Sequence, residues 1–409
     1  MAMRASGMVP PAASAPGSMM SVRRSNLALV MSKVAESSSD THLTRAQLAS
    51  ITGLTKASIS SLVLDLLNIG VIREFGLNPR GDRGRPGVGL QLNPSQAVMG
   101  LEINIDYIAA AVTDLSGTLL VHRTQERNNR SSLSDPLLQD LAVLAASVAS
   151  DVRARQVRIL GAGLAVPGLI DAQRGVVMSA PNLGWKDVLL DLDAIGPGLP
   201  LGVTLHNEAN ASALAHLRQG TGAAQDFLFI SGEVGIGGGL VVGSQLFTGP
   251  GGHAGEVGHV IVDPGGADCS CGATGCLETI AGQDAIFAAA GLLPQTSHAD
   301  IMAELLRELA GGVKDAVYAV HRAGWYLGVA LASTAKIVSV NSVVLGGHFA
   351  ILAPWLRSSL LTSLARHAPG RFSPEQVEVS IFGKTAALRG AAGSVVRAVV
   401  EAPHRLSDG

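Results

Sequence analysis

HAGEVGHVIVDPGGADCSCGATGCLE, residues 253–278, contains all three cysteines of the 409-residue chain. Structural zinc is almost always held by four thiolate or imidazole ligands in a tetrahedron. Cys269, Cys271 and Cys276 therefore indicate a metal site that needs a fourth ligand. Cysteines crowded into one loop do not resemble a disulfide framework, which would spread them along the chain. The sequence thus favours a reducing cytoplasm.

The composition is that of a chain with sizeable cores, since 47% of its residues are hydrophobic and 15% are charged. Its length suits two or more units. The longest apolar runs are too short for a membrane span, so we expect no membrane partner. Residues 1–20 are rich in Ala, Pro, Ser and Gly and lack the apolar centre of a signal peptide, which predicts a disordered tail.

The charge is distributed unevenly along the chain. Residues 1–90 contain ten Lys and Arg against five Asp and Glu, whereas the remainder contains 20 against 27. A basic segment favours nucleic acid as a partner only if it also has a suitable fold.

Residues 21–92 show the pattern of a three-helix domain. The first helix has one apolar face. The second is predicted to begin at Thr44, which forms a capping box with Gln47, and to end at Gly53. Thr55 then caps a third helix, which Gly70 ends. The residues predicted to point inward are Leu27, Val30, Met31 and Val34 in the first helix and Ile59, Leu62, Val63, Leu66 and Leu67 in the third.

The outward face of the third helix carries small polar groups and one cation. Such a face can enter a DNA major groove without steric conflict, so we predict that Lys56, Ser58 and Ser60 face base edges or phosphates. The alternative is an ordinary helical hairpin with a solvated face.

Two strand-like runs, residues 71–76 and 87–93, enclose a tip that carries Arg80, Arg83 and Arg85. Together with the helices they predict a winged helix-turn-helix. The tip contains Arg-Gly-Arg-Pro, which resembles the core of AT-hook segments. We therefore predict that Arg83 and Arg85 enter an A·T-rich minor groove.

Residues 93–409 alternate strand-like and helical runs, which predicts an α/β body. The glycine-rich residues 230–249 are typical of a strand, a tight turn and a second strand. Glycines let a backbone approach a ligand closely, but they are also common in plain hairpins.

HNEANASALA at 206–215, the glycine-rich turn, HAGEVGH and CSCGATGCLE follow in an order that closely resembles the ROK family of repressors, open reading frames and sugar kinases. The resemblance covers residues 21 to about 400 and includes the winged head of the family's repressor branch, which contains xylose and N-acetylglucosamine repressors. It implies a body of two actin-like (ribonuclease H-like) lobes with a sugar in the cleft between them.

The resemblance also implies the site residues. The fourth zinc ligand is expected to be His259, and the zinc is expected to be structural. The residues expected to bind the sugar are Asn207, Glu208, Glu256, His259 and Glu278.

The phosphate loops of active kinases in this family are altered here. Their Asp-x-Gly-Gly-Thr corresponds to Glu-Ile-Asn-Ile-Asp at 102–106, and their Gly-Thr-Gly to Glu-Val-Gly at 233–235. We expect Ile105 to project where backbone must approach the nucleotide, and the acids to repel its phosphates. Glu208 replaces the catalytic Asp, which shifts the carboxylate by about 1 Å and can slow catalysis on the order of 100-fold. We therefore expect no ATP.

These features favour a sugar-responsive DNA-binding regulator, a repressor of carbohydrate-metabolism genes, over a bifunctional glucokinase-like sugar kinase with a DNA-binding head. A zinc enzyme is disfavoured because four protein ligands leave no open position. The predicted partners are an inverted-repeat operator with A·T-rich flanks, a sugar or sugar phosphate effector, and further copies in a homodimer or homotetramer. The predicted location is the cytoplasm, at the nucleoid.

Overall fold

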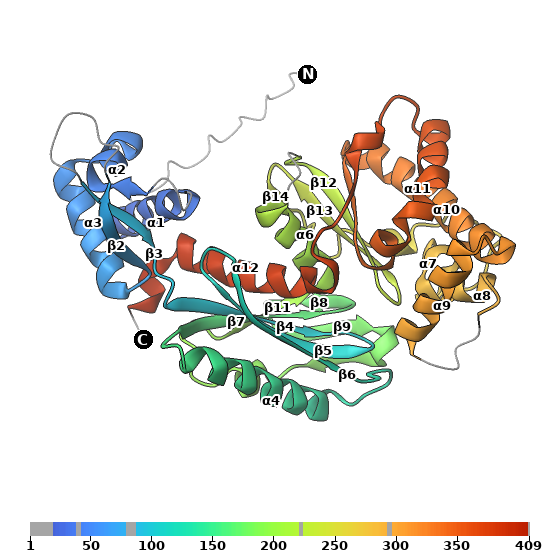
Figure 1. The fold of residues 1–409 in the computed structure, drawn as a ribbon, viewed down its shortest axis with the longest axis horizontal. Helices are drawn as coiled ribbons and strands as arrows, with labels where there is room; N and C mark the ends of the chain where they lie inside the picture. The colour runs from blue at the N-terminus through green and yellow to red at the C-terminus, as the bar shows by residue number, and fades with distance from the viewer. Residues whose placement is uncertain (1–18, 38–41, 79–86, 221–223, 293–296, 408–409) are drawn as a thin grey trace, which may run out of the picture. The chain divides into compact units, whose positions relative to one another are not determined.

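A computed structural model describes residues 19–37, 42–78, 87–220, 224–292 and 297–407. The chain divides into two compact units, the head (1–92 with 398–409) and the body (93–397). Residues 398–409, which the sequence analysis assigned to the body, thus group with the head. Met19 and Met20, assigned to the tail, form the first turn of a helix. Figure 1 shows the elements of both units.

The head is a winged helix-turn-helix. Its elements are α1 (Met19–Glu36), β1 (Leu43–Thr44), α2 (Arg45–Thr52), α3 (Lys56–Ile69), β2 (Ile72–Asn78) and β3 (Gly87–Leu92). The chain turns by 117° between α2 and α3, within the range typical of this motif. The three strands form a sheet in the order β1-β3-β2. The short helix η5 (Pro403–Leu406) packs against α1 and α3.

The sequence signals at the helix ends of the head are confirmed. Thr44 and Gln47 form the capping box of α2, and Thr55 caps α3. Gly53 and Gly70 adopt the left-handed conformation with φ of 72° and 84°, which glycine tolerates without strain. The predicted inward residues of α1 and α3 are buried, except that Leu67 is half-buried. Arg80, Arg83 and Arg85 lie outside the described residues.

The first lobe of the body is built on a five-stranded sheet in the order β11-β7-β4-β5-β6. Its strands are β4 (Gln96–Ile103), β5 (Tyr107–Asp114), β6 (Leu119–Glu126), β7 (Arg158–Val166) and β11 (Val203–Asn207). β4, β5 and β6 are antiparallel neighbours, whereas β7 lies parallel to β4 and to β11. A small sheet of β8 (Leu169–Asp171), β9 (Val176–Ala180) and β10 (Trp185–Leu189) follows β7.

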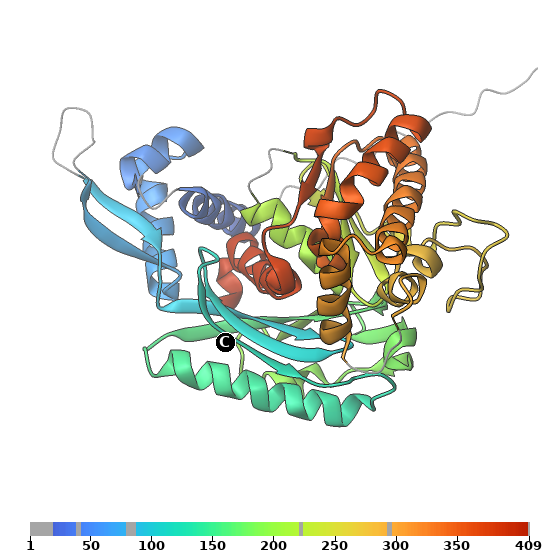
Figure 2. The same cartoon turned by 45° about the vertical axis from the view of Figure 1, so that its right-hand side comes forward.

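Two helices cover opposite faces of this five-stranded sheet. Figures 1 and 2 show α4 (Ser134–Arg153) along one face, where its apolar side chains join the sheet's core. α12 (Ala386–Glu401) crosses the other face. A Cβ at Gly100 or Gly163 would lie 2.1 or 2.3 Å from a carbonyl oxygen of α12, so only glycine permits this approach.

The second lobe has a sheet in the order β14-β13-β12-β15-β16. Its strands are β12 (Phe227–Gly232), β13 (Ile236–Val242), β14 (Gln245–Leu246), β15 (Val343–Leu345) and β16 (Val377–Val379). β12 and β13 are the predicted hairpin of the glycine-rich stretch. The longer helices of this part are α6 (Glu208–Gln219), α9 (His298–Ala310), α10 (Lys314–Val338) and α11 (Gly347–His367), and the shorter ones are α7 (Glu278–Ala281) and α8 (Gln283–Ala289). Two lobes with related sheets confirm the α/β, actin-like architecture.

Within the described ranges no single helix is long and apolar enough to cross a membrane, although α2 and α3 reach that length and apolarity when taken together across their bend.

Candidate functional site

Two neighbouring cavities open in the body. The small cavity has a volume of about 110 Å³, and all five residues predicted to bind sugar line it: Asn207, Glu208, Glu256, His259 and Glu278. The large cavity has a volume of about 1190 Å³. Asn104 and Glu233 line both cavities and so belong to the wall that separates them.

The structure brings His259 together with Cys269, Cys271 and Cys276, which we call the metal cluster. Their ligand atoms all lie within 4.8 Å of one another. Nδ1 of His259 is 3.6 Å from Sγ of Cys269, and Sγ of Cys271 is 3.7 Å from Sγ of Cys276. Thiolates about 2.3 Å from a tetrahedral zinc are separated by about 3.8 Å. The donor atoms and their spacing therefore fit a zinc ion.

His259 and two glutamates connect the metal cluster to the small cavity. Nδ1 of His259 faces the thiols, whereas its Nε2 lies 3.9 Å from a carboxylate oxygen of Glu256. Glu278, two residues after Cys276, accepts a hydrogen bond of 2.9 Å from the backbone N–H of Ile236. A Cβ at Gly235 would lie 2.4 Å from the same carboxylate. The glycine turn thus leaves room for Glu278.

Asn207 and Glu208 form the opposite side of the small cavity, at the N-terminus of α6. Oδ1 of Asn207 accepts from the N–H of Asn210, and its Nδ2 donates to the carbonyl of Gly168. Both polar ends of Asn207 therefore have protein partners. Glu208 is buried, and Ser231 donates to it at 2.6 Å. Burial raises the pKa of Glu208, and this hydroxyl opposes the rise.

Glu208 lies near the buried Glu102 and the half-buried Glu233, and we call these three carboxyl groups the acid cluster. Tyr107 donates to one oxygen of Glu102 at 2.8 Å, while the other oxygen is buried without a partner. Burial and the neighbouring Glu208 raise the pKa of Glu102 to about 8. Burial and then the charges of Glu208 and Glu102 raise the pKa of Glu233 well above its usual range.

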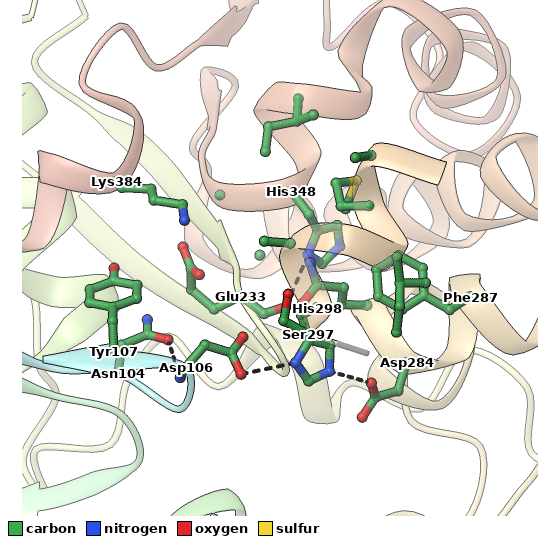
Figure 3. A pocket seen from close by; sticks show the side chains of 18 of the residues that line it. Asn104, Asp106, Tyr107, Glu233, Asp284, Phe287, Ser297, His298, His348 and Lys384 are labelled. Atoms are coloured by element: carbon green, nitrogen blue, oxygen red, sulfur yellow. Dashed lines mark hydrogen bonds and ion pairs between the residues drawn. The ribbon is translucent and has the colours of Figure 1, made fainter. Parts of the chain in front are cut away.

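Lys384 is the cation that faces the acid cluster. Figure 3 shows its ammonium group turned toward the carboxylate of Glu233, and it also lies 5.6 Å from the ring centroid of Tyr107. Its charge lowers the pKa values of Glu102 and Glu233, but less than burial raises them. Sequence reasoning identified the acids at 102 and 233 and missed Lys384, which is far from both in the chain.

Ile105 does not take the position that we expected. Its side chain is buried in the core of the first lobe, and it lines the small cavity rather than the large one. An isoleucine has no polar group to satisfy, so it packs inward at the end of β4. Of the polar residues on either side of it, Asp106 lines the large cavity and Asn104 lines both cavities.

Asp106 joins a charged bridge across the large cavity that sequence reasoning also missed. Nδ1 of His298 lies 3.0 Å from Asp106, and its Nε2 lies 2.8 Å from Asp284, as Figure 3 shows. Arg130 lies 3.5 Å from Asp284. Hydrogen bonds to the two carboxylates raise the pKa of His298 to about 9. Asp106 and Arg130 come from the first lobe, and His298 and Asp284 come from the second.

The predicted DNA-contacting residues of α3 have different surroundings. Lys56 and Ser60 are exposed. Ser58 is half-buried, and its hydroxyl lies 2.9 Å from that of Thr55, the residue that caps the helix. A role of Ser58 at DNA would compete with this local contact.

The chain is similar to known proteins over most of its length. The ROK family profile matches residues 98–397. A putative xylose repressor of Caldicellulosiruptor sp. (strain Rt8B.4) is 29% identical over 379 residues, which cover 88% of this chain and 93% of that protein.

Two solved structures are similar as well. A ROK family transcriptional regulator, a homologue of the E. coli Mlc protein, is 25% identical with a TM-score of 0.75, over 95% of this chain and all of that one. A ROK family glucokinase from Streptomyces griseus, solved with glucose and AMPPNP, is 25% identical with a TM-score of 0.61, over 74% of this chain and 99% of that one.

Proposed function

The chain belongs to the ROK family, and from this premise we propose that it is a sugar-responsive transcriptional repressor. The observation that carries the proposal is the presence of a winged helix-turn-helix and of a cavity lined by hydroxyl acceptors in one chain. Similarity to a xylose repressor and to a ROK transcriptional regulator over nearly the whole chain supports it. Its targets would be genes of carbohydrate metabolism, acted on in the cytoplasm.

We propose that the metal cluster holds one structural zinc ion. Zinc would fix the loop between His259 and Cys276 by cross-linking its two ends. Ligation through Nδ1 leaves Nε2 of His259 as an N–H donor, directed to the side of Glu256 and the small cavity. Four protein ligands leave no open position, which suits a structural role.

The small cavity would bind the sugar through hydroxyl groups. The carboxylates of Glu208, Glu256 and Glu278 can accept from hydroxyls, and His259 can donate to one. Asn207 was predicted to bind sugar, and its satisfied amide supports an indirect part in which it orders the first turn of α6 and so positions Glu208.

The acid cluster supports a body that binds sugar without phosphorylating it. Nucleotide phosphates require cations and free backbone N–H groups. Here the buried Glu102 and the half-buried Glu233 lie near Glu208, and the N–H of Glu233 donates to the carbonyl of Gly235. The glucokinase-like relative keeps the second candidate, a bifunctional sugar kinase, open to test.

A coupled assay of ATP turnover with xylose, glucose and N-acetylglucosamine separates these two functions. We expect turnover with each sugar to equal the sugar-free background. Sugar-dependent turnover that disappears in Glu208→Gln would establish the kinase instead.

The head would contact an inverted-repeat operator with A·T-rich flanks. Lys56 and Ser60 of α3 support a major-groove face, with Ser58 beside them, and Arg83 and Arg85 of the wing would enter the minor groove. Two recognition helices reach successive major grooves about 34–36 Å apart only in an oligomer, so we propose a homodimer or homotetramer. α12 begins in the body, and its last residues group with the head. One continuous helix therefore belongs to both the unit that would bind sugar and the unit that would bind DNA, which supports a response of DNA binding to sugar.

Operator binding, measured by fluorescence anisotropy at fixed salt with and without xylose, tests the proposal. A coupling of about 1–3 kcal/mol would change operator affinity about 5–150-fold. Glu256→Ala should bind operator like the wild type and lose the response to sugar, whereas Arg85→Ala should lose affinity most on A·T-rich flanks. A full sugar response in Glu256→Ala would contradict the assigned sugar site.

A further inference from the structure

The charge of the small cavity bears on whether the effector is a sugar or a sugar phosphate, both of which the sequence analysis left open. Four carboxyl side chains line it, those of Glu208, Glu233, Glu256 and Glu278. Among the described residues around it there is no Lys or Arg. Proteins recognise phosphate with Arg or Lys side chains, helix N-termini or free backbone N–H groups.

Three of the backbone N–H groups near this cavity already have acceptors in the protein. At the N-terminus of α6, the N–H of Asn210 donates to Asn207, and Glu208 places its own carboxylate in the first turn. In the turn between β12 and β13, the N–H of Glu233 bonds the carbonyl of Gly235, and that of Ile236 bonds Glu278. A phosphate at this cavity would therefore meet four carboxyl groups and no Lys or Arg side chain.

Glu233 lies between the small cavity and the large one. It lines both cavities, so a substituent that passes from the small to the large cavity must pass its carboxyl group. Glu102 is buried in the same cluster and has one unpartnered oxygen. Lys384 lines the large cavity and not the small one, and its charge acts on two carboxyls, Glu102 and Glu233, so one cation faces two acids.

We propose that the effector is a neutral, unphosphorylated monosaccharide, and that Glu233 is the residue that excludes sugar phosphates. This inference rests on the proposed function. A neutral sugar offers hydroxyl donors that match the carboxyl oxygens. A phosphate dianion would meet either ionised carboxylates, which repel it, or protonated carboxyls without a cation, which leave its charge uncompensated.

Isothermal titration calorimetry with matched ligand pairs tests the inference. The pairs are glucose with glucose 6-phosphate and N-acetylglucosamine with its 6-phosphate, and xylose serves as a sugar without a hydroxymethyl group. We expect the tightest ligand to be unphosphorylated, and its phosphate to bind on the order of 100-fold more weakly.

Two variants locate the cause of the discrimination. Glu233→Gln keeps the shape of the side chain and removes its charge, so it should reduce the ratio of affinities within a pair by on the order of tenfold. Glu126→Gln makes the same change at an exposed carboxylate that lines only the large cavity, and it should leave the ratio unchanged. Melting curves confirm that each variant is folded, and the wild-type ratio decides the effector class without them.

Each result has a separate meaning. Tighter binding of a sugar phosphate than of its parent sugar overturns the inference and leaves the sugar-responsive repressor intact. An unchanged ratio in folded Glu233→Gln overturns the role of Glu233. Binding of none of the five ligands counts against the proposed function itself and removes the inference with it.

Discussion

The metal cluster and the acid cluster both contribute residues to the lining of the small cavity, His259 from the first and Glu208 and Glu233 from the second, but the two clusters are assembled from the chain in different ways. The metal cluster takes all its ligands from one loop, residues 259–276. The acid cluster joins Glu102 at the end of β4, Glu208 at the start of α6 and Glu233 after β12, with Lys384 shortly before α12. One cluster therefore depends on local spacing, and the other depends on how two lobes meet.

The two clusters also differ in how fully their polar atoms have binding partners. In the metal cluster, four ligands suit one ion, and bound zinc would make it a stabilising element. In the acid cluster, three carboxyl groups that would carry like charges lie together at buried or half-buried positions, and one oxygen of Glu102 has no hydrogen-bond partner. A cluster of this kind costs stability when it ionises. The comparison predicts opposite effects when each cluster is removed.

The largest effect should follow from loss of the metal. Apparent zinc-binding free energies of structural sites are about 10–16 kcal/mol, so Cys271→Ser or prolonged chelation should loosen the loop, lower the melting temperature and abolish the response to sugar. Metal analysis of the purified protein should find one zinc per chain. Thr274→Ser, on the same loop with its hydroxyl kept, is the control. A wild-type protein without stoichiometric zinc would contradict the assignment.

Removal of a charge from the acid cluster should stabilise the protein. The pKa of Glu102 is raised in the fold to about 8 from an ordinary value of 4.5. The stability that this carboxyl contributes to the folded protein is therefore fully present below about pH 4.5 and is lost as the pH rises through about 8. Glu102→Gln should therefore raise the free energy of unfolding at pH 8.5 by a few kcal/mol, the free energy that corresponds to the pKa shift of Glu102. At pH 5 it should change the free energy of unfolding less.

Chemical denaturation of Glu102→Gln at these two pH values measures the difference. Glu126→Gln, at an exposed position, should change the stability little at either pH. A Glu102→Gln protein that is less stable than the wild type at pH 8.5 would show that the ionised carboxylate is compensated by its surroundings.

The charged bridge at His298 should give a smaller effect with a different pH profile. Its pKa is raised in the fold from 6.5 to about 9 by Asp106 and Asp284, so the stability that it contributes is fully present below about pH 6.5 and is lost as the pH rises through about 9. His298→Gln should cost about 1–3 kcal/mol at pH 6 and little above pH 9.

A parallel series with Asp284→Asn sharpens this result, because it removes only one partner of His298 and should cost less than His298→Gln. Equal losses at pH 6 and pH 10 in His298→Gln would mean that the ring acts by packing against Phe287, whose ring centroid lies 6.1 Å away, and not by charge.

The sequence by itself determined the features that depend on near neighbours. The caps at Thr44, Thr55, Gly53 and Gly70 follow from one helical turn or less. The metal cluster follows from donors spaced along a single loop. The β12–β13 hairpin was likewise visible as a short motif, because it involves only a few consecutive residues.

Only the tertiary structure decided which distant groups meet and which way a side chain points. Asp106 and His298 are 192 positions apart, and no local pattern links them. Ile105 lies in the core because burial of its apolar side chain is favourable, which the resemblance of residues 102–106 to a phosphate loop did not reveal. Lys384 reached Glu233 because α12 packs on the glycines of β4 and β7. Such contacts depend on the packing of whole lobes. The packing energy is shared among many residues, so no regular spacing of residues in the sequence indicates which side chains will meet.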